Sequence, residues 1–75
     1  MSKHHLAKYL DHPLSRYMVD AGLTQVELAK KIGITPQYIH YIVSGRRWPS
    51  YNLARELFKF TGVPIDTLLL YGREI

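Results

Sequence analysis

The chain has 75 residues, of which 47% are hydrophobic and 21% charged, with a formal net charge of +4 and no cysteine. This length and balance predict one small globular domain and argue against a disordered chain. The absence of cysteine excludes disulfides and thiolate metal sites and favours a reducing cytoplasm, while no apolar run approaches the roughly 20 residues of a membrane span.

Residues 1–11 are predicted to form an N-terminal extension, since no capping residue announces a helix there and no apolar centre of a signal peptide is present. His4, His5 and His12 are not joined by a carboxylate or cysteine pattern at metal-ligand spacing. We therefore expect no metal and no cofactor. These histidines would instead add positive charge near DNA below about pH 6.5, the ordinary imidazole pKa.

The first expected helix begins at Pro13 and ends at Gly22. Either Asp11 or His12 can cap it. Residues at helical spacing on one side predict its core-facing stripe, which consists of Leu14, Tyr17, Met18 and Ala21.

The second expected helix begins at Gln25. Thr24 can accept a hydrogen bond from the first-turn N–H groups, and Glu27, three residues later, completes a capping box. Gly33 is placed to end the helix. Gln25 lies where the N–H groups of a helix start point outward and can hold a phosphate. The core side is predicted to consist of Leu28, Ala29 and Ile32.

A third helix follows after a short break, with Thr35 as its cap and Pro36 at its first position, where no N–H is required. Two capped helices so close together predict a helix-turn-helix over residues 24–44. A helical wheel divides the third helix into two sides. The buried side consists of Thr35, Ile39, Ile42 and Val43, and the exposed side of Gln37, Tyr41 and Ser44, flanked by Tyr38 and His40.

The exposed side of this helix carries groups suited to DNA. Glutamine can pair with adenine through two hydrogen bonds, and tyrosine can bond a phosphate or stack. The core needs none of these groups at an exposed position, so we interpret them as contacts to a partner. The alternative is that the rings of Tyr38 and Tyr41 only cover hydrophobic surface.

The charge pattern supports a nucleic-acid partner. No acidic residue lies between Glu27 and Glu56. The basic residues of this interval are Lys30, Lys31, Arg46, Arg47 and Arg55. A basic segment alone is usually a solvated surface, but one that coincides with a helix-turn-helix indicates a phosphate backbone as partner.

Two further helices complete the expected fold. Ser50 caps the fourth, whose core side is predicted to be Leu53, Ala54, Leu57 and Phe58, and Gly62 ends it. Pro64 opens a short fifth helix with Ile65, Leu68 and Leu69 facing inward. Leu70, Tyr71 and Ile75 remain, and several large apolar groups at one end of a small domain suggest a contact surface.

The chain carries the sequence pattern of a known family. The positions that match it are Leu23-Thr24-Gln25, Glu27-Leu28-Ala29, Ile32-Gly33-Ile34, Ile39, Ile42, Ser44-Gly45-Arg46 and Pro49-Ser50. Over about residues 13–70 the chain resembles the Cro/cI-type helix-turn-helix domains of phage repressors, xenobiotic-response-type regulators and some antitoxins. The resemblance implies an all-α, compact five-helix lambda-repressor-like domain at residues 12–70. Residues 71–75 would form a C-terminal tail.

The resemblance also implies site residues. Bases would be read by Pro36, Gln37, Tyr38 and Tyr41, joined by His40 because it flanks the same face. The DNA backbone would be contacted by Gln25, Thr35, Ser44, Arg46 and Arg47. Dimer contacts in this family commonly come from the C-terminal part, so we expect a two-fold dimer through residues 65–75, formed by Ile65, Leu68, Leu70 and Tyr71.

The chain departs from the family pattern at three positions. Val43 stands where relatives often have an acid that pairs with an arginine, and Met18 matches the position of that arginine, so we expect an apolar contact instead. Pro36 cannot hydrogen-bond a base and can offer only shape or contact with a thymine methyl. Trp48 either packs under the loop or lies against the sugar-phosphate backbone.

We therefore predict a cytoplasmic, bacterial or phage-encoded regulator that binds double-stranded DNA sequence-specifically and makes no contact with a membrane. The simplest form is a Cro-like repressor that binds a near-palindromic operator as a dimer. We expect no enzyme activity, because no nucleophile, carboxylate pair or phosphate-cradling glycine loop is present. The alternatives are an antitoxin-type regulator that also binds a toxin, and a protein interaction module that has kept the fold.

Overall fold

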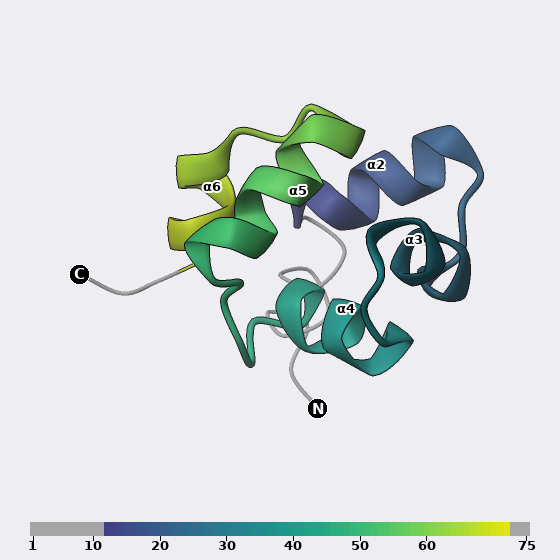
Figure 1. Cartoon of the computed structure of the whole chain (residues 1–75), viewed down its shortest axis with the longest axis horizontal. Helices are drawn as coiled ribbons and strands as arrows, with labels where there is room; N and C mark the ends of the chain where they lie inside the picture. The colour runs from purple at the N-terminus through teal and green to yellow at the C-terminus, as the bar shows by residue number, and fades with distance from the viewer. Residues whose placement is uncertain (1–11, 73–75) are drawn as a thin grey trace.

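The computed structural model describes residues 12–72, which form five α-helices and no strand (Figure 1). The helices are α2 (Pro13–Ala21), α3 (Gln25–Ile32), α4 (Pro36–Val43), α5 (Tyr51–Thr61) and α6 (Ile65–Leu70). The predicted all-α, five-helix fold is confirmed. The predictions for residues 1–11 and for Ile75 lie outside this part of the chain. None of the helices between residues 12 and 72 is long and apolar enough to cross a membrane.

Local capping explains why the helices begin where they do. The Thr24 hydroxyl accepts from the Glu27 N–H at 3.1 Å, and the Glu27 carboxylate accepts from the Thr24 N–H at 2.8 Å, which completes the predicted box. The Ser50 hydroxyl accepts from the Leu53 N–H at 3.2 Å. At the end of α3, Gly33 has φ +89°, a left-handed conformation that turns the chain toward α4.

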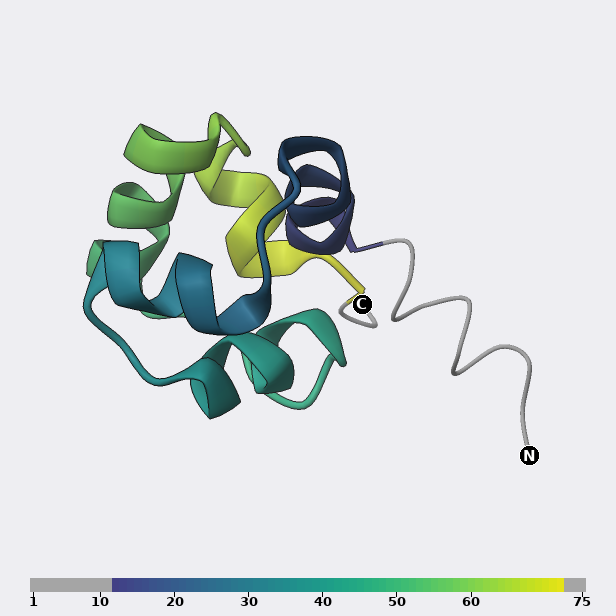
Figure 2. The ribbon, with the colours of Figure 1, turned by 90° about the vertical axis from the view of Figure 1, so that its right-hand side faces the viewer.

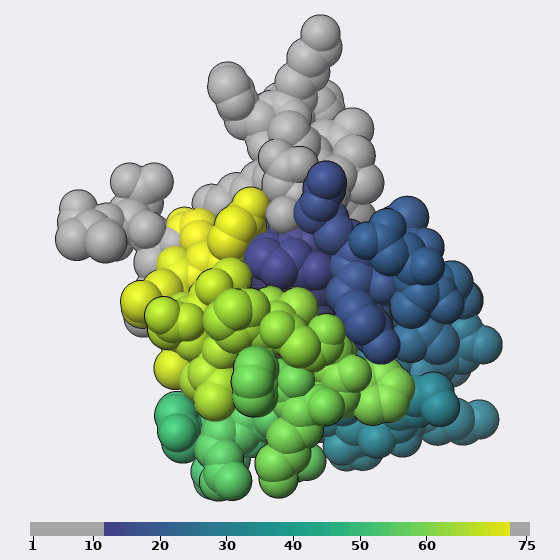
Figure 3. Space-filling view, turned by 90° about the horizontal axis from the view of Figure 1, so that it is seen from above, coloured from purple at the N-terminus to yellow at the C-terminus, as the bar shows by residue number. Residues whose placement is uncertain are grey.

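The core lies where the five helices meet. Its largest fully buried side chains are Leu14, Leu28, Ile39, Ile42, Val43, Leu57 and Leu68. In both ribbon views α4 lies along the lower edge of the molecule (Figures 1 and 2). The opposite face consists mainly of α2, α5 and α6 (Figure 3). The other four helices of residues 12–72 therefore leave the outer side of α4 uncovered (Figures 1 and 2).

Three residues assigned to the core by helical spacing lie on the surface instead. Ala21 is exposed because it is the last residue of α2. Phe58 is 45% exposed because the core side of α5 is centred on Ala54 and Leu57. Thr35 is exposed because it precedes α4 as the cap, with its hydroxyl accepting from the Tyr38 N–H at 3.2 Å.

Met18 and Val43 belong to the same hydrophobic core. They are 6% and 1% exposed, and α2 contacts α4 in the fold. Both positions that the family resemblance associates with an ion pair therefore lie inside an apolar cluster. Replacing a buried ion pair by well-packed apolar side chains need not weaken a fold, since removing two charges from water is itself costly.

His12 caps α2, which decides between the two predicted caps. Its Nδ1 accepts from the Leu14 N–H at 3.0 Å, the residue is 3% exposed, and its ring meets the Tyr71 ring edge-on with centroids 5.0 Å apart. Burial lowers the pKa of His12 from 6.5 to about 4. The expectation that His12 adds positive charge near pH 6.5 is therefore wrong, because an imidazole in this position stays neutral.

Because His12 is buried, we expect the folded protein to lose stability in acid. Its pKa is lower in the folded chain than in the unfolded chain, so the unfolded state takes up the proton first as the pH falls below 6.5. The free energy of unfolding should be fully retained above pH 6.5 and fall by roughly 1 to 3 kcal/mol by pH 4. Thermal melts between pH 7 and pH 4 measure this loss.

The matched control is His12→Asn, which keeps a capping side chain but cannot titrate in this range. Its melting temperature should depend less on pH than that of the wild type. Equal pH dependence in the two proteins would contradict the assignment of the transition to His12.

Candidate nucleic-acid interface

The exposed side of α4 places most of the predicted base-reading residues together. Pro36, Gln37 and His40 are exposed, while Tyr38 and Tyr41 are half-buried. Pro36 occupies the first helical position, and its ring lacks a donor. The remaining four side chains supply an amide, an imidazole and two phenols on one short helix.

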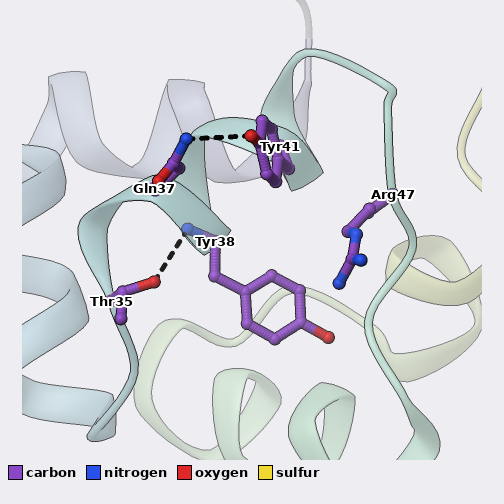
Figure 4. Close-up of a pocket in the computed structure, with 5 residues that line it drawn as sticks. All are labelled: Thr35, Gln37, Tyr38, Tyr41 and Arg47. Atoms are coloured by element: carbon purple, nitrogen blue, oxygen red, sulfur yellow. Dashed lines mark hydrogen bonds between the residues drawn. The ribbon is translucent and has the colours of Figure 1, made fainter.

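Gln37 and Tyr41 are joined directly. Gln37 Nε2 donates to the Tyr41 hydroxyl oxygen at 2.8 Å, one helical turn away (Figure 4). The rings of His40 and Tyr41 are tilted at 50° with centroids 6.2 Å apart. The amide and the phenol therefore form one polar unit on the exposed surface of the helix.

This unit borders an open hollow of about 220 Å³, lined by Thr35, Gln37, Tyr38, Tyr41 and Arg47. In Figure 4 the Arg47 side chain reaches from the loop after α4 toward the side of the hollow where the Tyr38 ring lies. The structure thus brings together four residues of α4 and its cap with one residue of the loop. Amide, hydroxyl and guanidinium groups are the donors and acceptors that match base edges and phosphates.

The alternative interpretation, that the Tyr38 ring covers hydrophobic surface, also holds in part. Its ring packs against the hydrophobic core while the side chain also lines the hollow. Covering the core and facing a partner are therefore compatible at this position.

The loop after α4 is held against the end of the helix. The Tyr41 carbonyl oxygen accepts from the Arg46 N–H at 2.9 Å and the Arg47 N–H at 3.2 Å. It also accepts from the Ser44 hydroxyl at 3.3 Å. Both arginine side chains are exposed. These hydrogen bonds thus hold the backbone of Arg46 and Arg47 against the end of α4, while their guanidinium groups lie at the surface.

Gln25 and the lysines occupy other parts of the surface. Gln25 is half-buried at the first position of α3. Lys31 Nζ lies 5.7 Å from the centre of the Phe60 ring of α5. A second hollow of about 380 Å³ is lined by Leu23, Glu27, Lys30 and Lys31. The basic residues of the acid-free interval are therefore divided, with Lys30 and Lys31 on α3, Arg46 and Arg47 beside α4, and Arg55 on α5.

Trp48, which was predicted either to pack under the loop or to lie against the sugar-phosphate backbone, makes a hydrogen bond within its own chain. Its indole Nε1–H donates to the Tyr71 carbonyl oxygen at 2.9 Å, and the side chain is half-buried. Tyr71 was not predicted as the acceptor of this bond. The sequence could predict only that the indole N–H of Trp48 has some hydrogen-bond partner, since a buried indole N–H usually requires one.

The four residues expected at a dimer contact differ in exposure. Leu70 is 60% exposed, while Ile65 and Tyr71 are half-buried. Leu68 is fully buried within its own chain and offers no surface to a partner. Tyr71, assigned to the tail, packs against His12 and Trp48, so the packed domain extends to this residue.

The family model described as helix-turn-helix matches residues 14–68. An uncharacterized HTH-type transcriptional regulator of Methanocaldococcus jannaschii is 39% identical over 62 residues, which cover 83% of this chain and 94% of the relative. Another from Archaeoglobus fulgidus is 34% identical over 53 residues, covering 71% of this chain and 76% of the relative. No solved structure gave a significant match.

Proposed function

The chain belongs to the Cro/cI-type helix-turn-helix family of transcriptional regulators, and on this basis we propose that it binds double-stranded DNA sequence-specifically and represses transcription. In the proposed complex α4 lies in the major groove. The protein acts by occupying its operator, with no catalytic step, and works in the cytoplasm. That a bacterium or a phage encodes this protein stays a prediction. The two relatives described above come from archaea.

The observation that carries this proposal is the exposed Gln37–Tyr41 pair beside two arginines whose backbone is bonded to the end of α4. Gln37 offers hydrogen-bonding groups that match base edges, which carry sequence information. Arg46 and Arg47 offer charges that match phosphates, which position the protein without specifying sequence. A surface that combines both within one helix and its following loop suits a specific DNA site.

The proposed base-reading set is Pro36, Gln37, Tyr38, His40 and Tyr41, and the proposed backbone set is Gln25, Thr35, Ser44, Arg46 and Arg47. We further propose that two copies bind a near-palindromic operator whose half-sites lie about one helical turn, roughly 34 Å, apart. Ile65, Leu70 and Tyr71 provide the surface available for the two-fold contact at the C-terminal end of the domain.

Replacing Gln37 by alanine tests the assignment of the reading helix. The variant should bind the preferred duplex more weakly by about 1 to 3 kcal/mol, because it loses contacts to a base edge. It should also tolerate other bases at one position of each half-site. Selection from a random duplex pool, followed by fluorescence anisotropy on the selected sequence, measures both effects.

Asn52→Ala is a matched control, because it removes an exposed amide from α5. This variant should bind with the affinity and preference of the wild type. If Gln37→Ala kept the wild-type preference at every base, the proposed reading face would be wrong.

A second candidate function is an antitoxin-type regulator that also holds a protein toxin. Exposed aromatic side chains on α5 favour it, since Tyr51 is 58% and Phe58 45% exposed. Exposed apolar groups that gather on a surface often mark a protein contact. Co-purification of a partner with the wild type, and its loss with Tyr51→Ser and Phe58→Ser, would support this role.

A further inference from the structure

The hydrogen bond between Gln37 and Tyr41 restricts what the Gln37 amide can offer to a base. A carboxamide carries two N–H donors and one carbonyl oxygen. One N–H is engaged with the Tyr41 hydroxyl at 2.8 Å. When the N–H that points away from Oε1 makes this bond, the other N–H and the carbonyl oxygen Oε1 lie side by side on an exposed side chain. The amide thus presents one donor next to one acceptor.

Adenine and guanine require different partners in the major groove. Adenine presents the N6 amino group as donor and N7 as acceptor, whereas guanine presents two acceptors, N7 and O6. A glutamine that rotates freely can turn its donor and acceptor toward adenine or its NH₂ group toward guanine. Glutamine alone is therefore a permissive reader, and a fixed amide is a selective one.

The Tyr41 side chain is well placed to fix the amide. Its ring is half-buried beside the His40 ring, and its carbonyl oxygen accepts from the two arginine N–H groups of the loop. The hydroxyl is thus attached to a part of the helix that is tied to the following loop. A group held in this way orients its hydrogen-bond partner before binding, which lowers the entropy lost on forming the complex.

We propose that Tyr41 is a positioning residue that holds the Gln37 amide in the orientation complementary to adenine and not to guanine. This inference rests on the proposed role of α4 in reading DNA. It assigns a base preference to one position in each half-site. It also gives the Tyr41 hydroxyl a role through Gln37 in addition to any contact of its own with DNA.

The test uses the full chain and duplexes selected from a random pool, with single-base changes at the position that depends on Gln37. Wild-type protein should prefer adenine over guanine there by on the order of 5- to 150-fold, the range of one good bidentate contact. Tyr41→Phe should reduce this ratio by roughly 2- to 12-fold, the effect of one neutral hydrogen bond. Anisotropy titrations measure the ratio directly.

Tyr51→Phe is the matched control, because it removes a tyrosine hydroxyl from α5, outside the proposed base-reading and backbone sets. It should leave the adenine to guanine ratio unchanged. A second control combines Tyr41→Phe with Gln37→Ala. In that background the loss of the hydroxyl should not change the ratio further, since the amide that it positions is gone.

The outcomes separate this inference from the proposed function. Wild-type protein that binds all duplexes equally would overturn both. A clear wild-type preference that Gln37→Ala changes and Tyr41→Phe leaves intact would overturn only the positioning role. Guanine at the Gln37-dependent position would overturn the assigned orientation of the amide, and additive effects of the two substitutions would show that Tyr41 reads DNA independently.

Discussion

Val43→Asp is expected to lower the free energy of unfolding by about 3 to 5 kcal/mol, the usual cost of an unpaired charge in a protein interior. Val43 is 1% exposed and lies in the core cluster that also contains Met18. A domain of this size has a total stability of roughly 5 to 10 kcal/mol, so the variant should be close to unfolding at room temperature. Urea denaturation followed by circular dichroism measures the loss.

Val43→Thr is the matched control, since it keeps the branched shape and adds only a neutral hydroxyl. It should cost about 1 to 3 kcal/mol. The family resemblance suggests a rescue, because relatives place an arginine at the position of Met18. Adding Met18→Arg to Val43→Asp should recover part of the loss through a new ion pair. If Val43→Asp caused no measurable loss in the free energy of unfolding, the burial of this position would be contradicted.

The double substitution of Arg46 and Arg47 by alanine is expected to weaken operator binding by at least about 3 kcal/mol per bound protomer, on the order of a hundredfold. Each arginine is expected to form a charge-assisted hydrogen bond with a phosphate. The loss should be similar for preferred and unrelated sequences. The fold should be preserved, because alanine keeps the two backbone N–H groups that donate to Tyr41.

The salt dependence of binding by this variant, compared with that of the wild type, indicates how many protomers bind the operator. A plot of log affinity against log salt concentration should lose about two from its slope for one bound protomer and about four for a dimer. Sedimentation at the same protein concentrations establishes the state of the free protein. Arg55→Ala with Lys59→Ala removes the same charge from α5 and should change the slope less. Equal slope changes would contradict the assignment of Arg46 and Arg47 to the backbone.

The helix boundaries were predictable because capping is local. Thr24 and Glu27 are three residues apart, and Thr35 and Ser50 each bond an N–H three residues later. Helical spacing was less reliable for burial. It gives the direction of a side chain but not the width of the covered stripe, so Phe58 was assigned to the core although it is exposed.

Contacts between distant parts of the chain were not predictable from spacing. The bond between Trp48 and Tyr71 joins residues 23 positions apart, and the neutral state of His12 depends on burial by the whole fold. At the candidate site, the wheel placed Gln37 and Tyr41 on one side of α4. Their hydrogen bond, and the approach of Arg47 from the loop, required the structure.

Trp48 is the only tryptophan in the chain, and its indole N–H is bonded to the last turn before the C-terminal end of the described fold. Indole emission is therefore an intrinsic optical signal from the loop that follows α4, with no label required. Loosening of the bond to Tyr71 would expose the ring to water and shift the emission to longer wavelength. The loop that carries Arg46 and Arg47 can thus be followed in real time while DNA is added.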